Sequence, residues 1–114
     1  MKKAKRCGMV VGLSSNPEKR KKYLELHDDS HPGVRHVISD CNIRNFSIFM
    51  RELDDGKEYL FLYWDYVGDD YEADMEKMDN HPDVKKWLEI CDPCQVPLQG
   101  ETSWAEMKEV YHND

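Results

Sequence analysis

The sequence of 114 residues holds 23 acidic and 16 basic residues, for a net charge of -7, and 39% of its residues are apolar. A chain of this length builds one core, so we expect a single domain over residues 1–114. The acidic balance excludes a general nucleic-acid binder, which needs a basic face, and no apolar run reaches the roughly 20 residues that span a membrane.

The chain begins with a basic segment and then an apolar stretch, the order found in signal peptides. Here the apolar stretch runs only from Cys7 to Leu13, and two glycines interrupt it. Alternation puts Met9 and Val11 on the same face as Cys7 and Leu13, which predicts a strand over about 4–13 with that face inward. We therefore expect a cytoplasmic protein.

The next region is predicted to be helical in two parts. Asn16-Pro17 is typical of a helix start, with Asn as the cap and Pro in the first turn. The helix is expected to run to about residue 29, and His31-Pro32-Gly33 interrupts it. Apolar residues then recur at helical spacing from Val34 to Cys41.

Two strands are predicted next, over about 43–51 and 58–66, on either side of the turn Leu53-Asp54-Asp55-Gly56. A second helical region begins after Asp69-Asp70 and restarts at His81-Pro82. A loop that contains two prolines leads to a last strand over about 103–111.

The order of the elements is β-α-β-β-α-β, which predicts an α+β, ferredoxin-like fold with a four-stranded antiparallel sheet and helices on one face. The other face of the sheet is left open, and the strand over 58–66 is rich in aromatic residues. A second copy of the chain is the simplest cover for such a face. We expect a homodimer, as a dimeric α+β barrel.

Tyr23 and His27 are four residues apart and project from the same side of the first helix. A histidine there is either a buried structural residue or a general acid, because imidazole exchanges protons near neutral pH. His27 and His31 also have the i, i+4 spacing of some metal ligands, although no recognised motif surrounds them. The pair Cys91 and Cys94 is a C-x-x-C at the end of a helical pattern, which favours plain thiols over a redox or metal site.

Asn45 and the aromatic residues of the strands are further candidates. An amide both donates and accepts hydrogen bonds, as sugar hydroxyls require, although Asn45 can equally be an ordinary strand residue. Aromatic side chains of the strand over 58–66 form either core or the wall of a cleft. Trp87 lies in a helical apolar stripe, which on that ground alone indicates core.

The chain resembles the L-rhamnose mutarotase family over nearly its whole length. The resemblance lies in an ordered set of segments: Met9-Val10-Val11, Asn16-Pro17, Tyr23-Leu24-Glu25-Leu26-His27, Asn45-Phe46-Ser47-Ile48-Phe49, Leu60-Phe61, His81-Pro82-Asp83-Val84-Lys85-Lys86-Trp87 and Met107-Lys108-Glu109-Val110-Tyr111-His112. It implies a dimeric ferredoxin-like enzyme that interconverts the α and β anomers of a 6-deoxy sugar, L-rhamnose first and L-fucose second, with no metal or other cofactor.

The resemblance also implies roles for individual residues. His27 is the proton donor, Tyr23 contacts the sugar, and Trp87 is the first of two adjacent tryptophans that line the pocket. The chain departs from the family twice, with Leu88 at the second tryptophan and Phe46 at a pocket tyrosine. These departures keep one alternative open, a non-catalytic sugar-binding or interaction domain, and a metal or redox role through His27, His31 and the cysteine pair is a third.

Overall fold

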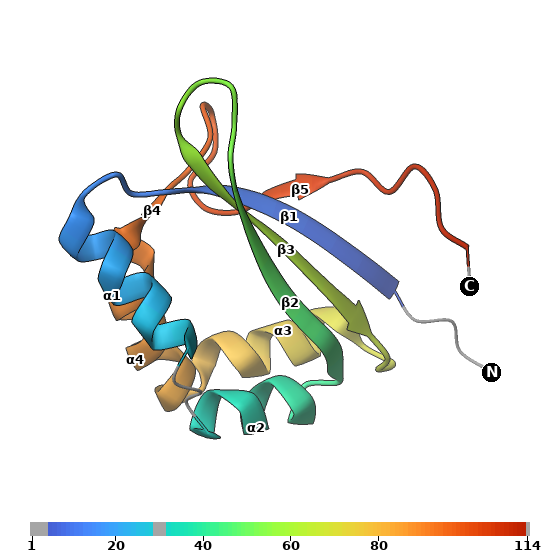
Figure 1. Ribbon diagram of the computed structural model, residues 1–114. Coiled ribbons are helices and arrows are strands. Elements are labelled where there is room, and N and C mark those ends of the chain that lie inside the picture. The colour runs from blue at the N-terminus through green and yellow to red at the C-terminus, as the bar shows by residue number, and fades with distance from the viewer. Residues whose placement is uncertain (1–4, 29–31, 114) are drawn as a thin grey trace.

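The computed structural model describes residues 5–28 and 32–113, and its centre is an antiparallel sheet (Figure 1). Strands β1 (Lys5–Leu13) and β3 (Glu58–Tyr66) lie in the middle, and β2 (Ile43–Glu52) pairs with β3. On its other edge β1 pairs with two short strands in turn, β4 (Gln95–Val96) and β5 (Ala105–Met107). The predicted α+β class and antiparallel sheet are confirmed, but the fourth strand position is shared by two strands.

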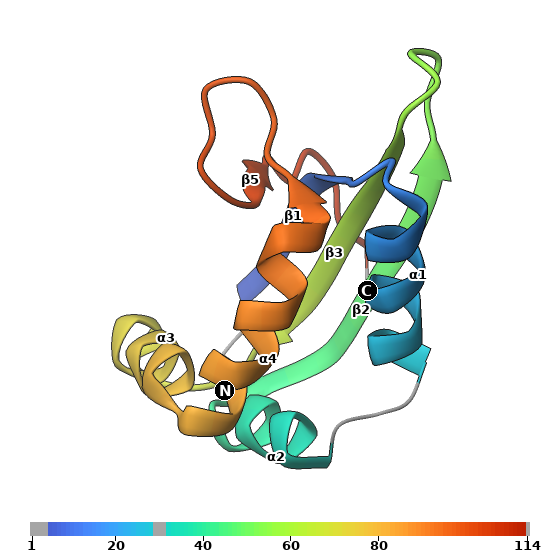
Figure 2. The same ribbon diagram turned by 90° about the vertical axis from the view of Figure 1, so that its left-hand side faces the viewer.

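Four helices lie on one side of this sheet, as Figure 2 shows. They are α1 (Pro17–Asp28), α2 (Pro32–Asp40), α3 (Tyr71–Asn80) and α4 (Pro82–Cys91), and a short 3-10 turn (Asp92–Cys94) follows α4. Each predicted helical region is therefore two helices, and the second of each begins at a proline because proline lacks the N–H that would continue the first. No helix in the described residues is long and apolar enough to cross a bilayer.

Side chains cap three of these helices at the positions that the sequence indicates. The Asn16 side chain accepts hydrogen bonds from Glu18 N and Lys19 N at 3.0 and 3.1 Å. Asp70 caps α3, and the His81 ring caps α4 through Asp83 N at 3.2 Å. These caps satisfy main-chain donors that a helix leaves unpaired, and they fix where each helix begins.

The core lies between the sheet and the helices. Val11, Leu13 and Leu60 are at most 5% exposed and pack with Tyr23 and the thiols of the C-x-x-C pair. A second cluster holds the helix-facing residues farther along the strands: Ile43, Leu62, Trp64 and Tyr66. The alternation predicted for β1 is thus confirmed, and it positions the residues of the candidate site on the helix side.

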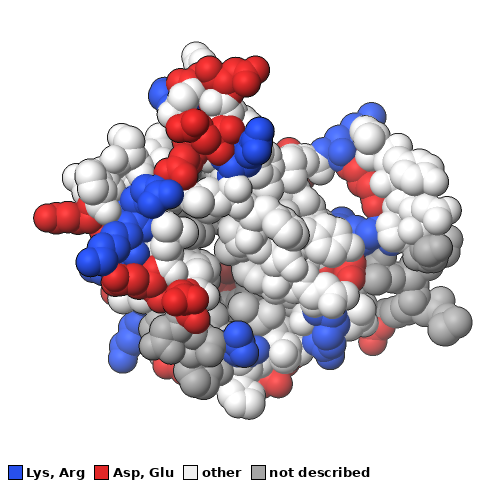
Figure 3. All heavy atoms as spheres, viewed as in Figure 1, with Lys and Arg blue, Asp and Glu red and all other residues white. Residues whose placement is uncertain are grey.

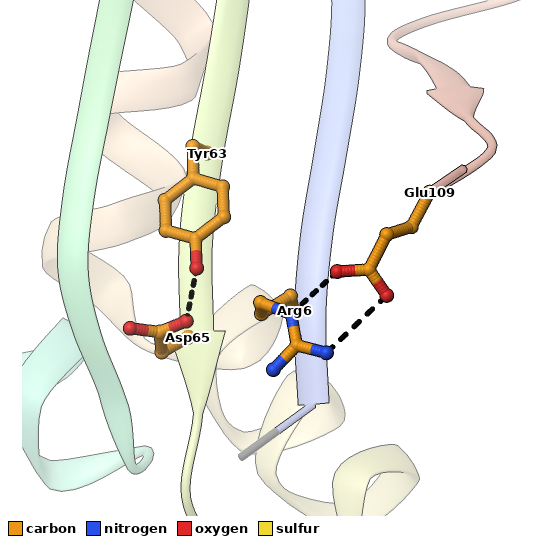
Figure 4. A network of polar contacts seen from close by, with 4 residues as sticks. All are labelled: Arg6, Tyr63, Asp65 and Glu109. Carbon is orange, nitrogen blue, oxygen red and sulfur yellow. Dashed lines mark hydrogen bonds and ion pairs between the residues drawn. The ribbon is translucent and has the colours of Figure 1, made fainter. Parts of the chain in front are cut away.

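The predicted last strand over 103–111 is wrong in its length. Strand β5 ends at Met107, and the segment up to residue 113 has no regular structure. Figure 4 shows how Glu109 in this segment is held by an ion pair with Arg6 of β1, with Arg6 Nη2 3.3 Å from Glu109 Oε2. One side-chain contact therefore replaces the strand pairing that the sequence pattern predicts.

Gly68, just after β3, lies where three polar side chains meet. Tyr66 Oη and Asn42 Nδ2 both donate to the Asp74 carboxylate, and a methyl group at Gly68 would come within 2.7 Å of Asn42 Nδ2 and of Asp74 Oδ2. We expect Gly68→Ala to lower the free energy of unfolding by about 1–3 kcal/mol, because these groups must move apart. Urea denaturation measures this free energy. Gly8→Ala is the control, since the closest contact of its methyl would be the flexible end of Met107 at 3.3 Å, and an equal loss in both variants contradicts this prediction.

The same cluster predicts a loss of stability in acid. Hydrogen bonds from Tyr66 and Asn42 lower the pKa of the Asp74 carboxyl. A carboxyl whose pKa is lower in the folded state stabilises the fold above its unfolded pKa of about 3.9, and this contribution disappears as the pH falls through the folded pKa. Urea midpoints between about pH 2 and 5 should therefore depend less on pH in Asp74→Asn than in the wild type, and identical slopes would show that the cluster does not titrate.

Candidate active site

Helix α1 places Tyr23 and His27 one above the other. Their rings stack with centroids 4.1 Å apart and an angle of 25° between the planes. His27 Nδ1 lies 2.7 Å from the main-chain oxygen of Tyr23. Because a carbonyl oxygen only accepts, Nδ1 carries a hydrogen in either charge state of the ring, and any exchange of a proton with a ligand takes place at Nε2.

Trp87 reaches the same place from α4. Its ring centroid lies 5.0 Å from that of His27, with the planes tilted by 54°. The two helices are brought together by the core cluster around Tyr23, against which Trp87 packs. The imidazole is thus held on one side by a phenol ring and on another by an indole.

Two adjoining hollows lie between the sheet and the helices. The outer chamber, of about 500 Å³, is lined by His27, Asn45, Trp87 and nine other residues. The inner chamber, of about 230 Å³, extends beneath α4 and is lined mainly by apolar side chains. The chambers share part of their walls: Val34, Ile38, Phe46, Ile48 and Trp87. The outer chamber has the volume of a small-molecule site.

All six residues predicted for the site line one or both chambers. His27 and Asn45 line the outer chamber, and Tyr23 and Leu88 line the inner one. Phe46 and Trp87 line both. Residues from α1, β2 and α4, far apart in sequence, therefore line two adjoining hollows.

Asn45 lies in the wall, but its amide is turned towards the sheet. Its Nδ2 donates to Asp65 Oδ2 at 2.8 Å. Its backbone has a φ of 56°, next to the register shift between β2 and β3 at Arg44 and Ser47. One of the two hydrogens on Asn45 Nδ2 is thus already used within the protein.

Tyr23 is the most buried of the six, at 2% exposed. Burial raises the pKa of its phenol, while a hydrogen bond from Gln95 Nε2 at 3.3 Å acts in the opposite direction. The phenol is therefore neutral at physiological pH, because burial disfavours the charged form.

The metal and redox alternatives find little support in the described geometry. His31 lies outside the described residues, and within them no group of three or more His, Cys, Asp or Glu side chains is arranged to hold a metal. Cys91 is the last residue of α4, and burial raises the pKa of its thiol to about 12. A reactive thiol has a lowered pKa and an accessible position, and Cys91 has neither.

Trp64, Gln95 and Trp104 also line the inner chamber and are not among the six predicted residues. Trp64 of β3 was noted only as one of several aromatic residues, and Gln95 and Trp104 lie in the segment predicted to be loop and final strand. The alternation of β3 indicates that Trp64 faces the helices, but it cannot tell a core residue from the wall of a cavity.

The model of the family described as L-rhamnose mutarotase matches residues 6–113 of the chain. The chain belongs to this family. Members of the L-rhamnose mutarotase family are isomerases that interconvert the anomers of a sugar, and the family resemblance inferred from the sequence is thereby confirmed.

Two members of the family illustrate the similarity. The L-rhamnose mutarotase of Sinorhizobium medicae is 28% identical over 99 residues, which covers 85% of this chain and 88% of that protein. The crystal structure of an L-rhamnose mutarotase from Formosa agariphila matches with a TM-score of 0.71 and 22% identity, over 96% of this chain and 99% of that one. The second match supports the fold that the sequence predicts.

Proposed function

We propose that this protein interconverts the α and β anomers of L-rhamnose by acid–base catalysis at His27, with no cofactor, and that L-fucose is the next candidate substrate. The observation that carries the proposal is the His27 ring in the wall of the outer chamber, oriented by its Nδ1–H bond to Tyr23. Membership of the L-rhamnose mutarotase family supports the same substrate class.

The reaction opens the pyranose to the free aldehyde and closes it on the other face. One group gives a proton to the ring oxygen as the bond from that oxygen to the anomeric carbon breaks, and another takes the proton of the anomeric hydroxyl. In our proposal His27 Nε2 gives the first proton, and a water molecule or a carboxylate takes the second. Rotation about the C1–C2 bond and the reverse transfers then close the other anomer. Such proton transfer contributes about 10²–10⁴-fold to the rate.

The other lining residues suit a 6-deoxy sugar. Phe46 and Leu88 give apolar wall for the methyl group at C6, and Trp87 presents a ring for the C–H face of the pyranose. The Tyr23 ring stacks on the His27 ring, and Asn45 of β2 lines the outer chamber.

The free face of the sheet supports the proposal of a homodimer. Phe49, which is 65% exposed, pairs with Phe61, and Phe61 in turn pairs with Val10, so that three apolar residues lie side by side across the strands. Figure 3 shows uncharged side chains gathered over the middle of the sheet, with charged groups around them. A second copy of the chain would cover this patch.

The four cysteines are all free thiols, which supports a location in the reducing cytoplasm.

Two-dimensional exchange NMR of the anomeric protons tests the proposal. The exchange rate of L-rhamnose anomers should rise in proportion to protein concentration above the rate without protein, and that of L-fucose should rise less. Binding of L-rhamnose with no acceleration would favour the alternative, a non-catalytic sugar-binding domain, for which Phe46 and Leu88, the two departures from the family pattern, are the supporting observation.

A further inference from the structure

Two indole nitrogens beside the chambers are buried and have no acceptor in the described chain. Within residues 5–28 and 32–113, neither Trp64 Nε1 nor Trp87 Nε1 finds a hydrogen-bond partner, and both atoms are shielded from solvent. Buried donors are rarely left unsatisfied, because the lost hydration of the N–H is then not replaced. An acceptor from outside the protein would satisfy both.

Trp64 lies in the wall of the inner chamber and is held firmly there. It is 6% exposed, and the Phe46 ring stacks against it with centroids 5.7 Å apart and an angle of 30°. Its neighbours on that wall are apolar, among them Met9, Leu62 and Ile48. The indole N–H is therefore one of a few polar groups in a mainly apolar surface, the arrangement by which binding sites fix the orientation of a ligand.

The position of Trp87 links this donor to the site of His27. Trp87 lines both chambers, whereas His27 lines only the outer one and Trp64 only the inner one. A ligand whose reacting atoms lie at His27 and whose ring packs on Trp87 extends towards Trp64. The Trp64 donor therefore meets the part of the ligand farthest from the chemistry.

We propose that Trp64 is a specificity-determining residue, whose indole N–H donates to a hydroxyl oxygen on the side of the sugar away from His27. This inference rests on the proposed function, which supplies the sugar. In a pyranose, C3 and C4 lie across the ring from the ring oxygen and the anomeric carbon, so the acceptor is the hydroxyl at C3 or C4. The inner chamber thereby distinguishes sugars by the configuration at C3 or C4, while His27 acts on the anomeric centre.

Replacing Trp64 by phenylalanine tests this inference, because an aromatic ring remains at this position and the indole N–H is lost. The KM for L-rhamnose should rise about five- to tenfold, the effect of one neutral hydrogen bond, with kcat within about twofold of wild type. Tyr111→Phe is the control and should leave KM unchanged, since it also removes one donor from an aromatic side chain, but Tyr111 is 79% exposed and lines neither chamber. An unchanged KM in Trp64→Phe overturns the inference.

The indole N–H signals of the wild-type protein give a second test that needs neither a variant nor turnover. With saturating L-rhamnose, the proton on Trp64 Nε1 should move downfield and exchange more slowly with solvent, and that of Trp104 should move less. If the sugar binds, Trp64 responds and the anomers do not exchange faster, the proposed function fails and this inference stands. A Trp64 signal that does not respond to bound sugar, or a protein that binds no 6-deoxyhexose, overturns it.

Discussion

Replacing His27 by alanine should slow the protein-dependent exchange of L-rhamnose anomers by about 10²–10⁴-fold at saturating sugar. The ring is held by a 2.7 Å hydrogen bond from Nδ1 to the Tyr23 carbonyl oxygen, between the Tyr23 and Trp87 rings. This arrangement fixes Nε2, and His27 is the only residue of α1 with an imidazole that lines a chamber. The loss should fall on kcat rather than on KM, because the proton transfer takes place only in the transition state. Exchange NMR, corrected for the rate without protein, measures both.

His36→Ala is the matched control for this variant. His36 is exposed on α2 and does not line either chamber, so its replacement should leave the rate and the melting temperature as in wild type. A His27→Ala protein that keeps half of the wild-type kcat would remove the imidazole from the mechanism. An equal loss in both variants would point to a general effect of the substitutions on the protein.

Replacing Phe49 by aspartate should convert the proposed homodimer into monomers. The Phe49 side chain is 65% exposed on the free face of the sheet, beside Phe61 and Val10. An unpaired carboxylate in the middle of an apolar interface loses its hydration without a compensating partner, so the dissociation constant of the dimer should rise at least about 100-fold. Sedimentation equilibrium over a range of protein concentrations measures it.

Leu53→Asp is the control, because Leu53 is also exposed, at 41%, but lies in the turn between β2 and β3. It should leave the association unchanged. A wild-type protein that is monomeric at high concentration, or a Phe49→Asp protein that still dimerises like the wild type, contradicts the proposed use of this face.

The fold could be predicted where local pattern and local chemistry agree. Alternation in β1 correctly gave the helix-facing side, with Val11 and Leu13 buried. The prolines at 32 and 82 correctly marked where a helix restarts, since each begins a new helix. Strand β4 was missed because two residues are too few for a pattern. The last strand was overextended because alternation indicates a face and not a pairing partner, and Val110 and Tyr111 are 87% and 79% exposed.

The candidate site could be predicted in part. The spacing of Tyr23 and His27 places both on one side of a helix, and the structure stacks their rings. Their approach to Trp87 depends on how α1 and α4 pack, which no local pattern contains. The same limit applies to Asn45, whose amide is turned to Asp65 by a backbone with positive φ, and to Trp64, whose buried N–H is evident only in three dimensions.

A crystal structure with L-rhamnose bound tests the central claim most directly. Our account predicts a pyranose in the outer chamber, with His27 Nε2 within hydrogen-bond distance of the ring oxygen or the anomeric hydroxyl, and with Trp87 against its C–H face. A sugar bound elsewhere on the protein, or bound in the chamber with its anomeric carbon and ring oxygen turned away from His27, would contradict it.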